Sequence, residues 1–284
     1  MLLQAVSARH GTFLVYICAA HPQPPTPLPT VSLKTVLITG CSDNGIGSAL
    51  RLEFRKRGYY VFAAARDILK MTWIKDLDHI TPIVLDVKKP TDIKNALETV
   101  RKATEGKLDY LVNNAGRNHF MPVLDVEVDE VRELFETNYF APLAITQAFA
   151  PLLIEAKGNI SFVTSISGYV NTPWMVLTVV TGGVKTSGQT YFDDLQLPGE
   201  SLYKSVEKTI VKRAKGGDGM PRMDAGEFAK AVVDEMQKGK AGKFWYGEFA
   251  EMVRGAMTNV EVPVEVMDAQ MIQGTGLNTW KSSF

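Results

Sequence analysis

One short stretch of the sequence, from Thr39 to Gly47, has the residue types and spacing to bind a phosphate group. It reads TGCSDNGIG, follows an apolar run and precedes a segment with helical periodicity. Glycines let the backbone turn tightly, so a pyrophosphate can lie against the N-terminus of the next helix, where free N–H groups and the helix dipole attract anions. Asn44 fits such a turn, because asparagine tolerates left-handed backbone. A glycine-rich turn without ligand is the alternative, and the place between strand and helix favours the phosphate site.

The surrounding pattern predicts the elements that would position this loop. Short apolar runs at 35–39, 60–65, 82–85, 108–112, 159–164 and 175–180 indicate strands, and 242–246 indicates a final edge strand. Helical spacing of apolar residues predicts helices around 46–54, 93–100, 131–152, 202–210 and 225–236, with a bend near Pro142 and a cap at Asp224. Strands that alternate with helices predict an α/β fold with a doubly wound parallel sheet.

Three ordered motifs resemble those of the short-chain dehydrogenases/reductases. The glycine-rich loop is similar to the family's cofactor loop with one extra residue, residues 113–116 read NNAG as in the family, and Asn138 stands where the family has a catalytic-site asparagine. The sequence is closer still to fungal NADPH-dependent 1-acyldihydroxyacetone-phosphate reductases and their secondary-metabolite cluster relatives. That likeness rests on the extra loop residue, on Ala65-Arg66, on Thr172-Pro173-Trp174 and on residues 180–186.

The resemblance implies a Rossmann fold, NADP (as NADPH) as cofactor, and a small-molecule carbonyl or alcohol as substrate. Arg66 stands where NADP-preferring members have a cation, and a guanidinium can pair with a ribose 2′-phosphate. A solvated surface arginine is the alternative. The other residues that the resemblance places at the cofactor are Gly40, Ser42, Ile46 and Gly47 at the diphosphate, Asp86 at the adenine, Asn114 and Gly116 below the ribose, and Val184 and Thr186 at the nicotinamide amide.

The catalytic set departs from the family pattern. By resemblance, Ser165 orients the substrate carbonyl and Asn138 belongs to the same site. The family's acid is a tyrosine, and a lysine one helical turn later lowers the pKa of its phenol and binds the nicotinamide ribose. No tyrosine of this chain is followed by lysine four residues later. Thr178 lies near the expected position, but an aliphatic hydroxyl is a poor general acid near neutral pH.

The distance between two strand-like runs accounts for this loss. Parallel neighbours need a crossover of a dozen or more residues, usually with a helix, whereas only residues 165–174 separate the fifth strand from the run at 175–180. We therefore expect the family's helix between the fifth and sixth strands to be missing, through a skipped exon or mis-spliced gene model at Trp174/Met175. We also expect the sixth strand to pair either not at all or through a strained connection, with apolar sheet surface left uncovered.

The chain divides into three predicted regions: an N-terminal extension (1–33), a single Rossmann domain (34–247) and a C-terminal tail (248–284). The nine apolar residues of Thr12–Ala20 are too few to span a bilayer, and five prolines follow in His21–Thr30. A disordered extension or an early start codon fits better than a secretory signal. We predict no transmembrane segment and a cytoplasmic protein, with endoplasmic-reticulum or lipid-droplet association as the alternative that the resemblance implies.

Composition argues against several other classes. Lysine plus arginine (31) balance aspartate plus glutamate (31), so no global field favours nucleic acid, and 45% apolar residues support a packed core. The two cysteines, Cys18 and Cys41, form neither a disulfide framework nor a metal cluster. His79 and His119 lack the spacing of zinc ligands, so we expect no metal site.

Two functional classes remain open. The first is an oxidoreductase that uses NADPH to reduce a ketone or aldehyde on a lipid-like, polyketide-like or terpenoid-like substrate. The second is a catalytically silent relative that binds nucleotide or a partner without turnover. Residues 187–198 resemble the family's substrate lid, which has no readable code for the substrate. The oligomeric state also stays open, because the missing helix usually joins the preceding long helix in the family's subunit interface.

Overall fold

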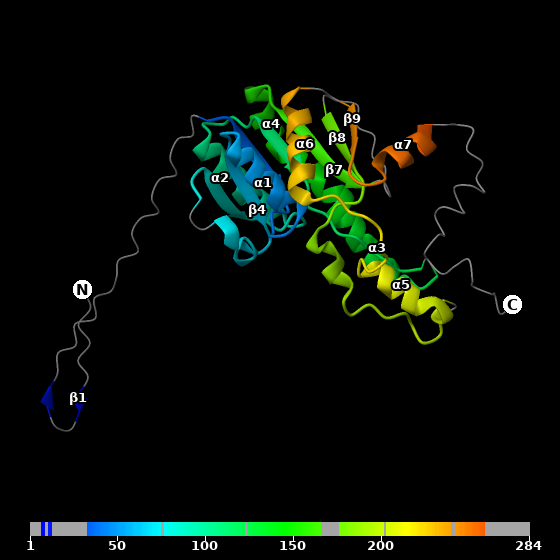
Figure 1. The fold of residues 1–284 in the computed structure, drawn as a ribbon. Coiled ribbons are helices and arrows are strands. Elements are labelled where there is room, and N and C mark those ends of the chain that lie inside the picture. Colours follow the sequence, from blue (N-terminus) through cyan, green and yellow to red (C-terminus); the bar gives the residue numbers. More distant parts are fainter. Residues whose placement is uncertain are drawn as a thin grey trace.

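The computed structural model describes residues 7–8, 11–12, 33–74, 77–122, 124–165, 176–201, 203–239 and 242–258. Its main element is a seven-stranded sheet with the order β5-β4-β3-β6-β7-β8-β9, in which every neighbouring pair is parallel. The strands are β3 (Thr35–Thr39), β4 (Tyr60–Ala65), β5 (Ile80–Val84), β6 (Tyr110–Asn113), β7 (Asn159–Ser165), β8 (Val176–Thr181) and β9 (Gly242–Tyr246). With helices on both faces, this confirms the doubly wound Rossmann fold (Figure 1).

Two helix layers enclose the sheet. Helices α1 (Ile46–Lys56) and α6 (Ala225–Gln237) pack on one face, and α2 (Pro90–Ala103) and α4 (Ala141–Ala156) pack on the other. Consecutive residues of β3 serve both cores: Val36 and Ile38 lie in the first cluster and Leu37 in the second, all fully buried. Burial on both faces explains why this central strand is apolar throughout instead of alternating.

The predicted element bounds hold closely. The runs 35–39, 60–65 and 242–246 form strands over those residues, and β5 spans 80–84 instead of 82–85. Pro82 is tolerated inside β5 because that strand lies at the edge of the sheet, where a missing N–H costs little. Helix α6 begins after Asp224, whose carboxylate accepts from the amides of Gly226 and Glu227 at 2.8 and 3.2 Å, which confirms the predicted cap.

A long helix runs from Val128 to Ala156 in three parts. These are α3 (Val128–Phe135), a π-helical turn η3 (Glu136–Phe140) and α4. The widened turn directly precedes Pro142, which cannot donate to the carbonyl four residues before it. By length and composition alone this helix could cross a membrane. Its residues Ile145, Phe149 and Leu152 pack instead against the sheet.

The pairing of β7 with β8 limits what can connect them. Ile160 pairs with Val176 and Ser165 with Thr181, so the connection must return about 17 Å along the strands. A helix made of all the residues from 166 to 175 would be only about 15 Å long and would leave none for the turns. These residues lie outside the described ones. The parallel pairing itself is present. Thr178 and Val180 of β8 are buried, so β8 leaves no uncovered apolar surface at these residues, whereas Ile160 and Phe162 of the neighbouring β7 are only half-buried.

Exposed apolar side chains lie on the long helix instead. Phe135, Tyr139 and Leu143 recur every fourth residue and are 53%, 51% and 49% exposed. They form an aromatic and aliphatic stripe on the side of the helix away from the sheet core.

The segment 187–214 packs on the loop after β6. It contains the 3₁₀ turns η4 (Ser187–Phe192) and η5 (Lys204–Val206) and helix α5 (Glu207–Ala214). Leu197, Val206 and Ile210 form a small core with Phe120 and Met121. Helix α7 (Ala250–Thr258) follows β9, and the short strands β1 (Ser7–Ala8) and β2 (Gly11–Thr12) pair near the N-terminus. The division into three regions stays a prediction.

Candidate active site

The glycine-rich loop packs so closely that two of its glycines admit no side chain. A Cβ on Gly47 would lie 2.3 Å from the carbonyl oxygen of Gly40 and 2.6 Å from Nδ2 of Asn114. A Cβ on Gly40, whose φ is +73°, would lie 2.8 Å from Cα of Ala115. Asn44 also has positive φ, +62°, as its residue type predicted. The loop therefore presents backbone to a ligand at the carboxyl end of β3.

Helix α1 begins with open amide groups. Its N-cap is Gly45, which has no side chain to cap it, and its first turn has no acidic residue. Ser48 Oγ accepts from the Gly45 amide at 3.1 Å and donates to the Gly45 carbonyl at 2.7 Å. Among the described residues, no hydrogen bond uses the amides of Ile46 and Gly47. With half-buried Ser42 beside them, these groups fit an anion at the positive end of the helix dipole.

Thr39 and Asn114 join the ends of the neighbouring strands β3 and β6. Nδ2 of Asn114 donates to the carbonyls of Thr39 and Gly40 at 2.8 and 3.1 Å. In return, Oγ1 of Thr39 accepts from the amides of Asn114 and Ala115, both at 3.0 Å. Asn114, predicted at the ribose, therefore also holds the glycine-rich loop in place.

The residues predicted at the adenosine end follow the next two strands. Arg66 comes directly after β4 and is exposed. Asp86 follows β5, and its carboxylate is only 19% exposed and accepts from the amide of Lys88 at 3.1 Å. Strands β4 and β5 lie beside β3 in that order, so both residues stand along the same sheet edge as the glycine-rich loop.

Asn138 lies in the π-helical turn and binds the loop that contains Gly116. Its Oδ1 accepts from the amide of Arg117 at 2.9 Å, and its Nδ2 donates to the carbonyl of Arg117 at 2.8 Å. A Cβ on Gly116 would lie 3.4 Å from Asn138 Oδ1. Asn138 therefore fixes the path of the chain after the NNAG motif, a role that requires a side-chain amide with both a donor and an acceptor.

The remaining predicted residues lie at the ends of β7 and β8. Ser165 ends β7, is exposed and stands opposite Thr181 in the parallel register. Val184 is buried, and Thr186, two residues later in the same segment, is half-buried. The next residue, Ser187, donates its amide to the carbonyl of Asn44 at 3.0 Å. This contact brings the segment after β8 against the glycine-rich loop.

Comparison with known proteins identifies the chain's relatives. Residues 34–178 match the family model for short chain dehydrogenases. The chain belongs to the short-chain dehydrogenase family. This short-chain dehydrogenase is 38% identical over 244 residues to short-chain dehydrogenase ptmH of Penicillium ochrochloron, covering 76% of this chain and 89% of that protein. It is 31% identical over 255 residues to the NADPH-dependent 1-acyldihydroxyacetone phosphate reductase of Schizosaccharomyces pombe, covering 78% and 84%. The family consists of oxidoreductases that use a nicotinamide cofactor.

Solved structures share the fold. A short-chain dehydrogenase from Streptomyces avermitilis superposes with a TM-score of 0.66 at 21% identity, covering 87% of this chain and 98% of that one. One from Burkholderia cenocepacia in complex with NADP gives a TM-score of 0.63 at 20% identity, covering 84% of this chain and 98% of that one.

The alignment with ptmH also compares the lengths of the two chains. It is 244 residues long, which is more residues than the 76% of this 284-residue chain that it covers. The relative therefore has residues that this chain lacks, enough for a helix of several turns.

Two tyrosine side chains on the strands and helices next to the site of this short-chain dehydrogenase are packed against other aromatic rings. Tyr110 packs with the rings of Phe54 and Tyr59 in the core, and burial raises the pKa of its phenol to about 12. Tyr139, next to Asn138, contacts the rings of Phe135 and Phe140 on the exposed stripe. Tyr169, four residues after Ser165, lies outside the described residues. Neither Tyr110 nor Tyr139 is therefore the catalytic acid that the family pattern leads us to expect.

Sequence reasoning missed a buried ion pair inside the cofactor loop. Nη2 of Arg51 lies 2.6 Å from Oδ1 of Asp43, and its side chain is fully buried while that of Asp43 is 13% exposed. Nη1 of Arg51 donates to the carbonyl of Cys41 at 2.7 Å. Burial alone would raise the pKa of Asp43, but hydrogen bonds from Thr72 and Arg51 outweigh it and lower the pKa. The only sequence signal was a charged residue on the apolar face of α1.

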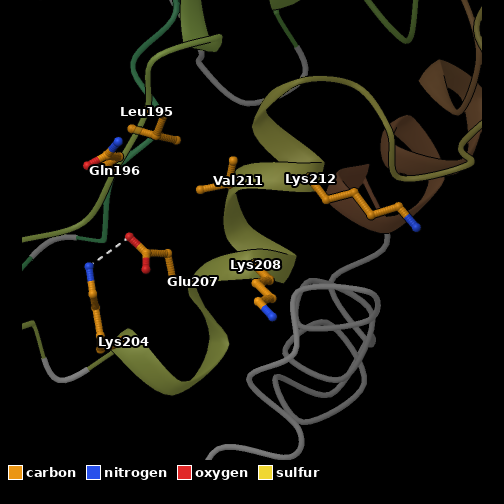
Figure 2. A pocket seen from close by; sticks show the side chains of 7 residues that line it. All are labelled: Leu195, Gln196, Lys204, Glu207, Lys208, Val211 and Lys212. Atoms are coloured by element: carbon orange, nitrogen blue, oxygen red, sulfur yellow. Dashed lines mark hydrogen bonds and ion pairs between the residues drawn. The ribbon is translucent and has the colours of Figure 1, made fainter.

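A metal site or a pocket elsewhere in the described residues would be an alternative to this edge of the sheet. In the described segments, no group of three or more histidine, cysteine or acidic residues could hold a metal ion. A hollow of about 480 Å³ lies between α5 and the chain at Leu195 and Gln196. Figure 2 shows that Lys204 reaches Glu207 on that side, at 2.9 Å, whereas Lys208 and Lys212 point away from the pair. None of the predicted cofactor residues lines this hollow.

Proposed function

We propose that this chain binds NADPH along the carboxyl edge of the sheet and reduces a ketone or aldehyde on a lipid-like, polyketide-like or terpenoid-like substrate. The observation that carries the proposal is the close-packed loop with the open N-terminus of α1, next to an exposed arginine after β4. The donor set fits the group, because open amides suit the diphosphate and a guanidinium suits a 2′-phosphate. The name of the Schizosaccharomyces pombe relative supports NADPH and a lipid-like substrate.

Bound NADPH supplies the hydride for the reduction. The chain's own residues bind and orient: the loop and α1 hold the diphosphate, Asn114 keeps the loop against β6, and Asn138 fixes the chain after Gly116. The hydroxyl of Ser165, exposed at the end of β7, is placed to donate a hydrogen bond to the substrate carbonyl. That bond would hold the carbonyl for attack and stabilise the charge that develops on its oxygen.

Arg66 provides the first test. The native protein should bind NADPH more tightly than NADH, and Arg66→Asp should remove the preference because it replaces an attractive charge with a repulsive one. The measurement is a fluorescence titration of both nucleotides. Lys102→Asp, the same charge change at the C-terminal end of α2 on the opposite edge of the sheet, should leave the preference unchanged. Equal affinities of the native protein for the two nucleotides would contradict the assignment of Arg66.

A second candidate function, nucleotide binding without turnover, is favoured by the missing tyrosine and lysine. General acid catalysis supplies about 10² to 10⁴ in rate, so turnover by this chain should be lower by at least that factor than turnover by a version with a tyrosine-lysine helix restored between Trp174 and Met175. The measurement is NADPH oxidation with a panel of acyl-ketone and aromatic ketone substrates. If the chain as written is comparably active and Ser165→Ala abolishes that activity, it holds another acid and the reductase function stands alone.

A further inference from the structure

Asp43 connects the cofactor loop to a second part of the sheet edge. One carboxylate oxygen, Oδ1, is paired with buried Arg51 of α1 at 2.6 Å. The other, Oδ2, accepts from the backbone amide and the hydroxyl of Thr72 at 2.7 and 2.8 Å. The amide of Asp43 donates to the carbonyl of Lys70 at 2.8 Å. A single loop residue thus makes three hydrogen bonds to the segment after β4.

That segment begins with Arg66, the cation predicted at the 2′-phosphate. It continues through the 3₁₀ turns η1 (Ile68–Lys70) and η2 (Thr72–Ile74). Asp67 caps η1 by accepting from the amide of Leu69 at 2.9 Å. Residues Arg66 and Ile68–Lys70 are exposed, whereas Met71 and Ile74 are buried in the core cluster of α1 and anchor the far end of the segment. Because Arg66 is exposed and flexible in its side chain, the position of its backbone decides where the guanidinium can reach.

The rigidity of Asp43 comes from α1. Arg51 is fully buried, and a buried guanidinium without an anionic partner is strongly unfavourable, so the pair cannot separate at little cost. Nη1 of Arg51 also holds the carbonyl of Cys41 at 2.7 Å. Helix α1 therefore fixes Oδ1 of the Asp43 carboxylate, and Oδ2 binds Thr72.

We propose that Asp43 and Thr72 are positioning residues for cofactor specificity: they hold the segment of Arg66 at a fixed distance from the diphosphate loop, so that NADPH can contact both together. This inference rests on the proposed function. Met71 and Ile74 attach the segment to the core, but the Asp43 contacts are what tie it directly to the diphosphate loop. Without the Asp43–Thr72 contact, binding the second phosphate would have to fix the exposed residues from Arg66 to Lys70 relative to that loop, which costs conformational entropy. NADH has no 2′-phosphate and needs no contact with that segment, so its affinity does not depend on the link.

The test uses Thr72, because its side chain is exposed and its replacement leaves the buried ion pair intact. Thr72→Val removes the hydroxyl bond, and Thr72→Ser keeps it. We expect Thr72→Val to weaken NADPH binding by about two- to twelvefold, the range of one ordinary net hydrogen bond, because the contact is exposed and the amide of Thr72 still binds Asp43, with NADH binding unchanged. Thr72→Ser should keep the native ratio of the two affinities. Thr91→Val, an exposed threonine in the first turn of α2, is the control, and thermal melts verify folding of each variant.

The outcomes separate this proposal from the function on which it rests. If native protein prefers NADPH and Thr72→Val keeps the same ratio of affinities, Asp43 and Thr72 do not set specificity, and the proposed function stands. An equal loss of affinity for NADPH and NADH shows a merely structural contact and also overturns the proposal. A native chain that binds neither nucleotide contradicts the proposed function, and the positioning role falls with it. A selective loss in Thr72→Val that Thr72→Ser does not show confirms the role.

Discussion

The hydroxyl group of Thr39 serves three backbone groups at the centre of the site. It accepts from the amides of Asn114 and Ala115 at 3.0 Å and lies 3.4 Å from the carbonyl of Val112, to which it donates. Thr39 is 1% exposed, so water cannot replace it at the two amides. The position of the NNAG motif relative to the glycine-rich loop therefore depends on the side chain of Thr39, which is neither a glycine of the loop nor an asparagine of the motif.

Thr39→Val should lower the free energy of unfolding by about 2 to 4 kcal/mol, because two buried amides lose their acceptor and each unsatisfied group costs about 1 to 3 kcal/mol. The shape of the side chain is nearly unchanged, so packing loss adds little. Urea unfolding measures the change. Thr99→Val, half-buried on α2 with its hydroxyl bonded to the carbonyl of Asn95 in the same helix, should change stability by less than about 0.5 kcal/mol. Similar values for the two variants would show that water or a rearranged loop satisfies the amides.

Local pattern and long-range contact explain which site residues the sequence could predict. Gly40, Gly47 and Asn44 were predictable because backbone conformation follows from residue type within a short window. The roles of Thr39 and Asp43 were not, because their partners lie 75 and 29 residues away. Such pairs become visible only when the strand order is known. Ser165 and Asn138 were found through family likeness and not through their own neighbours.

At the scale of elements, the long helix from Val128 to Ala156 shows the effect of the missing crossover helix. Its period was predicted because one face of its C-terminal part, α4, packs on the sheet. Its exposed stripe was not, since we expected the uncovered apolar surface on the sheet, where Thr178 and Val180 are in fact buried. A pattern of apolar residues predicts that a helix face is apolar, but it does not identify the neighbouring element that is missing.

The exposed stripe should make the protein self-associate. Leu143→Gln, which places a polar group at the C-terminal end of the stripe, should lower the fraction of large species in light scattering and sedimentation, because contiguous exposed apolar surface drives association. Leu69→Gln is a matched control: Leu69 is 77% exposed and lies in η1, outside the stripe. If both variants associate as strongly as the native chain, the stripe is not the surface responsible.

At the scale of the whole molecule, the sheet order places the first strand of the domain in the middle. β3 lies between β4 and β6, and its pairing with β6 joins Val36 to Tyr110. The backbone amide of Thr35 also donates to the carboxylate of Asp109 at 2.8 Å. The alternation of strand and helix predicted the layers and the parallel direction, whereas the exchange of position after β5 follows only from family likeness.

This central position has a consequence for how the chain folds in time. Because every neighbouring pair is parallel, no pair can close as a hairpin, and each must wait for a crossover to form. The interval before both neighbours are present is longest for β3, because its second partner, β6, is available only when the ribosome has released residues up to Tyr110 and beyond. Beyond that point strands add in chain order from β6 to β9. In pulsed hydrogen exchange during refolding, amides of β3, β4 and β6 should therefore gain protection before those of β8 and β9. Simultaneous protection of all strands would show that the sheet forms in one step.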